Sequence, residues 1–254
     1  MKPRTAARPF NRSLALALLL VPAPLLAHYP WVTPADYAPE PGEPLEFSVG
    51  FGHHFPGSDT LAVDRIESVV LMDAAGEVKV IELESGPSFQ SGPLPGDAPW
   101  ILAAQQRRAY YSRTPRGGQR SSRIENPDAL SCSQSSNSAK ALLGHGAEAP
   151  ESPLGHALEI VPLAAEAAVG LAFAVRVLFH GKPRPGTVQA VYDGFHGAED
   201  AYPVNVTSDE AGVARLEFDR PGSWLIKAQA AEDYPDPAVC DRRNYNATLT
   251  LMVR

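Results

Sequence analysis

Short segments that alternate between apolar and polar residues recur along this chain of 254 residues. Residues 45–49 alternate in this way, and 66–72 and 78–83 are joined by turn residues at 73–76, as in a β-hairpin. We find no long segment with the 3.6-residue periodicity of an amphipathic helix. The pattern therefore predicts an all-β protein.

Residues 1–27 have the composition of a secretory signal peptide. A basic start without acids precedes an apolar run, and Ala27 suits the cleavage position. The run is too short to cross a hydrocarbon layer of about 30 Å. An uncleaved anchor is the less favoured alternative, because Pro22 and Pro24 interrupt a spanning helix. We expect an exported chain that begins at His28 and is not inserted in a membrane after cleavage.

The mature chain is acidic. The leader contains four of the 22 basic residues and none of the 29 acidic ones, which leaves 18 basic residues, 29 acidic residues and a formal charge of −11. This charge argues against nucleic acid or an anionic membrane surface as a partner. It suits a protein that attracts cations, although most acids on such a surface are simply solvated.

The mature chain divides at a segment rich in Gly, Pro and acidic residues. We predict two β-sandwich domains in tandem: an N-terminal β-rich domain at 28–143, a linker at 144–153 and an immunoglobulin-like sandwich at 154–254. The second domain has about seven short strands at the spacing typical of that fold. Within it, 213–218 and 223–228 are expected to form a hairpin.

The N-terminal domain contains a segment of different character. Six arginines lie between 107 and 123, and a Ser-rich stretch follows them. Such a segment fits either an anion-binding or partner-binding patch or an irregular, solvated connection. The composition favours the irregular connection.

Cys132 and Cys240 are the only cysteines. In an oxidising compartment an isolated pair more often forms a disulfide than two free thiols. The pair lacks the close spacing and neighbouring histidines of a metal site. We therefore predict a Cys132–Cys240 disulfide.

His28 offers two nitrogen ligands if it is the first residue of the mature chain: the α-amine and the imidazole. These groups can close a chelate ring on Ni²⁺ or Cu²⁺, which accept both kinds of nitrogen. His53 and His54 provide further imidazoles at what resembles a strand end. Because adjacent strand residues point to opposite faces, only one of the two can readily face His28 within a strand. The amine must lose its proton to bind a metal, so acid should weaken the site.

Several segments resemble the periplasmic nickel-uptake accessory proteins (NikM- and NikK-like), a family long carried as a domain of unknown function. The similar segments are Ala27–Trp31, Gly52–Gly57, Leu154–Leu163, Val175–Pro183, Thr207–Gly212 and Pro221–Ile226. The resemblance covers most of the mature chain outside about 87–138. It implies a periplasmic β-sandwich protein that binds nickel or cobalt for uptake, with His28 and His53 as ligands and a membrane metal transporter as a possible partner. His54 departs from the family pattern and is either an extra ligand or an outward-facing neighbour.

The other histidines have simpler explanations. We expect His145 and His156 to be solvated and His180 to be a turn residue, while His196 lies in a loop with a small chance of being a ligand. Trp31 and Trp224 are expected in the core.

The sequence contains no hydrolase, zinc-protease, phosphate-loop or dinucleotide-binding motif, so we expect no enzyme. Two alternatives remain open. One is a copper histidine brace, as in CopC-like carriers and lytic polysaccharide monooxygenases. The other is a structural β-sandwich module that binds no metal.

Overall fold

The computed structural model describes residues 28–254 except 58, 85, 87, 97, 147, 199 and 200. The predicted leader, 1–27, lies outside the described residues. The described part of the chain contains no α-helix, only a 3₁₀ turn, and the all-β prediction is confirmed. No helix in this part of the chain is long and apolar enough to span a membrane.

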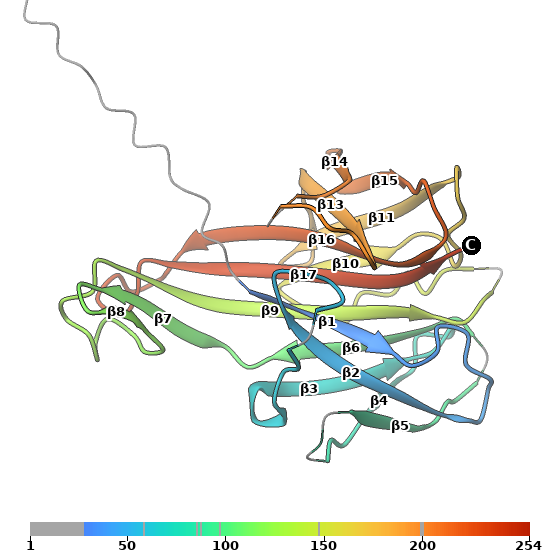
Figure 1. The fold of residues 1–254 in the computed structure, drawn as a ribbon, viewed down its shortest axis with the longest axis horizontal. Coiled ribbons are helices and arrows are strands. Elements are labelled where there is room, and N and C mark those ends of the chain that lie inside the picture. Colours follow the sequence, from blue (N-terminus) through green and yellow to red (C-terminus); the bar gives the residue numbers. More distant parts are fainter. Residues whose placement is uncertain are drawn as a thin grey trace, which may run out of the picture.

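The elements follow one another along the chain in the order shown in Figure 1. The first half contains β1 (Tyr29–Pro34), β2 (Pro44–Gly52), the 3₁₀ turn η1 (Val63–Arg65), β3 (Ile66–Met72), β4 (Val78–Val80), β5 (Phe89–Pro93), β6 (Trp100–Gln106), β7 (Ala109–Thr114), β8 (Gly117–Gln119) and β9 (Ser131–Leu143). The second half contains β10 (Leu158–Pro162), β11 (Ala172–Phe179), β12 (Lys182–Pro183), β13 (Gly186–Tyr192), β14 (Val204–Ser208), β15 (Val213–Glu217), β16 (Gly222–Asp233) and β17 (Arg242–Val253).

One ten-stranded sheet joins the two halves of the chain. Its main path runs β14-β13-β16-β17-β9-β6-β3-β4, with β7 and β8 attached beside β9. The junction is the parallel pairing of β17 with β9. The two halves therefore share a sheet across the segment 144–153, which connects β9 to β10.

Two smaller sheets cover opposite faces of the long sheet. The sheet β1-β2-β5 lies on one face, and the sheet of β10, β11, β12 and β15 lies on the other (Figure 1). Strand β6 shows this arrangement, since Ile101 and Ala103 belong to one hydrophobic core and Leu102 and Ala104 to the other. Successive strand residues point to opposite faces, and both faces of β6 are buried, so its sequence is apolar from Trp100 to Ala104. Two sandwich cores are present, and they share their middle layer.

The segments 213–218 and 223–228 do not form the predicted hairpin. Strand β15 pairs with β11 in a smaller sheet, whereas β16 pairs with β13 and β17 in the long sheet. The chain thus crosses between layers at this point. Strands β15 and β16 bury their apolar faces in the same core, one from each of the two packed sheets. The alternation of apolar residues in each segment therefore does not show which strand it pairs with.

Much of the Arg- and Ser-rich segment forms regular strands, and only 120–130 has the expected irregular structure. Strands β7 and β8 make an antiparallel hairpin, and β7 also pairs with β9. The polar residues Ser136, Asn137 and Ser138 of β9 are buried, because the strand lies between β17 on one side and β6 and β7 on the other. Asn137 and Ser138 make side-chain hydrogen bonds; for example, the Ser138 hydroxyl donates to the Leu158 carbonyl at 2.9 Å.

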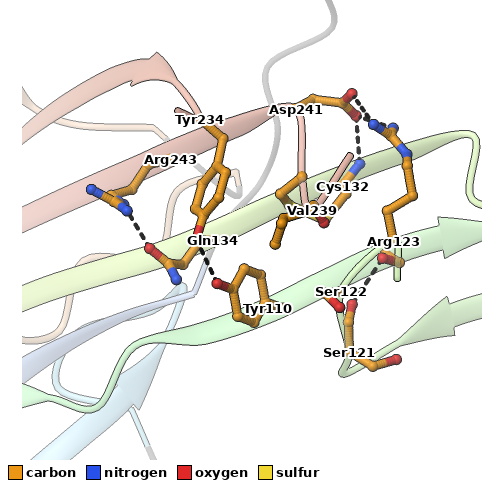
Figure 2. The surroundings of a disulfide bond; sticks show 12 residues. Tyr110, Ser121, Ser122, Arg123, Cys132, Gln134, Tyr234, Val239, Asp241 and Arg243 are labelled. Carbon is orange, nitrogen blue, oxygen red and sulfur yellow. Dashed lines mark hydrogen bonds and ion pairs between the residues drawn. A yellow bond between two sulfur atoms is a disulfide. The ribbon is translucent and has the colours of Figure 1, made fainter. Parts of the chain in front are cut away.

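The predicted disulfide is confirmed. Cys132 and Cys240 are bonded, with their Cα atoms 4.9 Å apart. Figure 2 shows Asp241 beside them, where it accepts a hydrogen bond from the Cys132 amide at 2.7 Å and pairs with Arg123 at 2.6 Å. The bond closes a loop of 108 residues and contributes about 4 kcal/mol of stability in the chain-entropy model. A disulfide of this kind fits a protein that folds outside the cytoplasm.

Candidate metal site

The pairing of β1 with β2 brings His28 and His53 to the same place. The two strands are antiparallel, and Tyr29 lies opposite Gly52 at the end of the ladder. One further step along each strand places His28 opposite His53. Residues opposite each other in an antiparallel pair point to the same face, with Cβ atoms about 5 Å apart. The two imidazoles are therefore cross-strand neighbours, although they are 25 positions apart in sequence.

The rings of this pair are close and differ in exposure. Their centroids are 4.1 Å apart with an interplanar angle of 53°. The His28 ring also stacks on Phe51, at 5.3 Å and 14°. His28 is exposed, whereas His53 is half-buried. The pair thus lies at the surface, where one ring is accessible to an incoming ion and the other is held against the protein.

A tyrosine hydroxyl holds the backbone of His53 in place through a hydrogen bond. The Tyr29 hydroxyl, buried on the opposite face of β1, donates to the His53 carbonyl at 3.1 Å. That hydroxyl lies 3.2 Å from the Tyr202 hydroxyl, which accepts a hydrogen bond from the Lys227 ammonium at 2.7 Å. The ammonium also lies 4.2 Å from the centre of the Tyr29 ring, a cation–π distance. These contacts tie the bend after β2 to β16.

Trp31 holds the rest of this bend. Its indole N–H donates to the Pro56 carbonyl at 3.1 Å, and its ring lies flat over Gly50. A Cβ atom at Gly50 would lie 2.1 Å from the indole nitrogen, so only glycine allows the ring to lie there. The core placement predicted for Trp31 and Trp224 is confirmed, since both side chains are fully buried.

The other candidate ligand, His54, is exposed beside the pair. It lines a small cleft together with His53, Phe195 and Gly197, so the loop that carries His196 runs next to the bend. His196 itself is exposed and does not line that cleft. His54 stays a candidate third imidazole.

The remaining histidines lie elsewhere. His145 is exposed and His180 occupies a turn with a φ of 49°, as expected for each. The prediction that His156 is solvated is wrong. It is half-buried beside the Lys140–Glu159 ion pair, and burial, followed by the charge of Lys140, lowers its pKa to about 4. His156 lies just before β10, which covers the long sheet, so its ring is partly covered.

The side chains alone do not complete a metal site. In 28–254, apart from the seven positions left out, no three His, Cys, Asp or Glu side chains converge on one point. The imidazoles of His28 and His53 supply two nitrogens, and the α-amine of a chain cleaved after Ala27 would supply a third. Three such nitrogens suit Ni²⁺ and Cu²⁺, which favour square-planar or tetragonal coordination by nitrogen.

The sequence interpretation missed the residues that support the pair. Residues Tyr29 to Val32 are all buried, because both faces of β1 are covered, so β1 lacks the alternation that marks a half-buried strand. The register of β1 against β2 cannot be read from its sequence either. The positions of Phe51 and Tyr202 depend on register and on contacts between distant segments, so no local pattern shows them.

Comparison with known proteins gives a family but no activity. No curated protein matches the chain. A family profile described as "Domain of unknown function (DUF4198)" matches residues 25–232, from three positions before His28 into β16. The match covers most of the sequence, and the chain belongs to this family.

Proposed function

We propose that this protein binds a divalent transition metal ion in the periplasm and holds it for uptake. The observation that carries the proposal is the cross-strand contact of the His28 and His53 rings, with centroids 4.1 Å apart. The ion would be bound by these two imidazoles and the α-amine of His28, with His54 as a possible additional ligand. Nickel is the first choice and cobalt the second, on the basis of the sequence resemblance.

The arrangement supports binding and release rather than a chemical reaction. Both histidines lie at the surface, so the ion can be exchanged with a partner such as a membrane metal transporter. The acidic mature chain as a whole attracts cations to the protein. The tie from His53 through Tyr29 to Tyr202 and Lys227 keeps one ligand in place before the ion arrives, which reduces the entropy lost on binding.

A copper-binding protein of the histidine-brace type is the second candidate. The same observation favours it, because a brace consists of an N-terminal amine, its own imidazole and one further imidazole. Copper also binds such nitrogen sets more tightly than nickel or cobalt does. Which ion occupies the site in the cell therefore depends on supply and delivery as well as on affinity.

We expect the metal-free mature protein to bind one equivalent of Ni²⁺, Co²⁺ or Cu²⁺ in calorimetric titrations, with the tightest binding for Cu²⁺. Binding should release protons, because the α-amine must be deprotonated to coordinate. Titrations in two buffers of different ionisation enthalpy measure that release. Failure to bind any of the three ions would refute the proposal and favour a structural β-sandwich module.

A further inference from the structure

A cleft of about 320 Å³ opens directly beside the histidine pair. We call it the His28 cleft. It is lined by His28 and Phe51, by Arg65 and Arg120, and by residues of β6, β7, β9 and β17. Its volume falls at the lower end of the range for small-molecule sites. A ligand in this cleft would touch the exposed imidazole of the proposed metal site.

The charge of the cleft is opposite to that of the protein. Arg65 and Arg120 both line it, and none of the described residues that line it carries a carboxylate. No ion pair of either guanidinium occurs within the part of the chain that the structure describes. Burial, and then the positive charge of Arg120, lower the pKa of Arg65, although Asp64 opposes this. Two like charges facing one space in a protein with an excess of acids indicate a site for an anion.

Arg65 is connected to the histidine pair through one aromatic ring. Its guanidinium carbon lies 4.5 Å from the centre of the Phe51 ring, and the same ring stacks on His28. Phe51 therefore contacts both a cation and a proposed metal ligand. Arg65 and His28 also line the same cleft, so one ligand in the cleft can contact both.

Buried polar side chains form part of the cleft lining. Gln106, Asn137 and Asn246 line it and are each almost completely buried. The Asn137 amide donates to Gln106 at 2.9 Å and accepts from the Asn246 amide at 3.0 Å. Asn246 in turn accepts from Gln229 at 2.8 Å. Such a network holds amide groups in fixed directions, which suits a small ligand with several oxygen atoms.

We propose that the His28 cleft binds a small polycarboxylate chelator, so that the metal reaches His28 and His53 as an anionic chelate. This inference rests on the proposed function. Guanidinium groups bind carboxylates with paired, charge-assisted hydrogen bonds. The carboxylates that contact Arg65 and Arg120 orient the chelator, and its metal exchanges ligands for the nitrogens of His28 and His53. The cleft thereby selects the form in which the metal is captured.

The test uses citrate as the probe, alone and as its nickel complex. Calorimetry of the metal-free mature protein should show citrate binding that is at least about tenfold weaker in R65Q/R120Q, since charged hydrogen bonds of this kind are lost. The control R113Q/R215Q removes the same charge at two exposed arginines outside the cleft and should bind citrate like the wild type. R65Q/R120Q should bind weakly buffered Ni²⁺ within about twofold of the wild type, because the nitrogen ligands are unchanged.

The outcomes separate this inference from the proposed function. The variant H53A should lose nickel affinity but keep citrate, because His53 does not line the cleft. Absence of nickel binding in the wild type with citrate binding intact would overturn only the metal part. Equal citrate affinity in R65Q/R120Q and the wild type would overturn the carboxylate site. So would inorganic phosphate that binds as tightly as citrate, because the cleft would then be a general oxyanion site.

Discussion

Replacing His53 with alanine should lower the affinity of the mature protein for Ni²⁺ by at least about a hundredfold. Even partners outside the coordination shell contribute ten- to a hundredfold to metal affinity, and His53 is proposed as a direct ligand. The variant keeps the amine and imidazole of His28 but loses the second imidazole, whose ring centroid lies 4.1 Å from that of His28. Competition titration with a nickel-binding dye measures the change.

The fold should tolerate this substitution. His53 is half-buried at a bend, and the hydrogen bond that fixes the bend goes from Tyr29 to the His53 backbone carbonyl, which alanine keeps. His145→Ala, at an exposed histidine far along the sequence, is the matched control and should leave affinity unchanged. His54→Ala, measured beside them, decides whether His54 joins the site. Wild-type affinity in the His53 variant would remove His53 from the ligand set.

Replacing Glu159 with glutamine should destabilise the protein by about 3–5 kcal/mol, the usual cost of leaving one member of a buried ion pair alone. Lys140 of β9 and Glu159 of β10 are 2.5 Å apart, and both side chains are almost completely buried. Burial lowers the pKa of Lys140, and Glu159 opposes that shift. The variant therefore leaves a buried ammonium without its counter-charge between the long sheet and β10.

Urea unfolding followed by tryptophan fluorescence measures this loss. The amides of Leu154 and Gly155 donate to different Glu159 oxygens, at 2.6 and 3.0 Å. Glutamine keeps an oxygen for only one of them, so the loss includes one hydrogen bond as well as the charge. In the variant the folded Lys140 has a pKa further below its ordinary 10.5 than in the wild type, and stability should rise with pH toward that value. The double variant K140M/E159Q should recover most of the loss. A single variant within about 1 kcal/mol of the wild type would contradict this account.

Local patterns were sufficient to predict the fold class and several strands. The alternation in 66–72 matches β3, and the apolar segment before His180 matches β11. The disulfide followed from two cysteines in an exported chain. These features depend on residues close in sequence or on a simple count, so a sequence is enough to show them.

The shared sheet could not be predicted in this way. It depends on the parallel pairing of β9 with β17, in which Asn137 lies opposite Asn246. Strand β9 begins with serines and other polar residues, which normally mark an exposed loop. They can be buried here because their backbone groups hydrogen-bond to strands on both sides. Side chains far away in sequence, such as Gln106 and Asn246, hydrogen-bond to the Asn137 side chain. Tertiary contacts outweigh local propensity at this strand.

The candidate site was only partly predictable. Its histidines were identified from the end of the leader and from the resemblance, but their contact depends on the register of β1 against β2. A shift of one residue would send His28 and His53 to different faces. The sequence did not indicate that Arg65 and Arg120 would lie near the histidines. Arg65 follows β2 by 13 residues, and Arg120 belongs to a segment expected to be irregular. Folding of β7 and β8 as a hairpin brings Arg120 to the cleft.

The central claim is that the α-amine of His28 binds the metal together with the His28 and His53 imidazoles. Its most direct test is a nickel titration of two proteins that differ by one residue: the mature chain that begins at His28, with its terminus verified by mass spectrometry, and the same chain with one alanine added before it. The added residue converts the amine into an amide and leaves both imidazoles in place. We predict that the extended protein binds Ni²⁺ about a hundredfold more weakly, whereas equal affinity in the two proteins would contradict the claim.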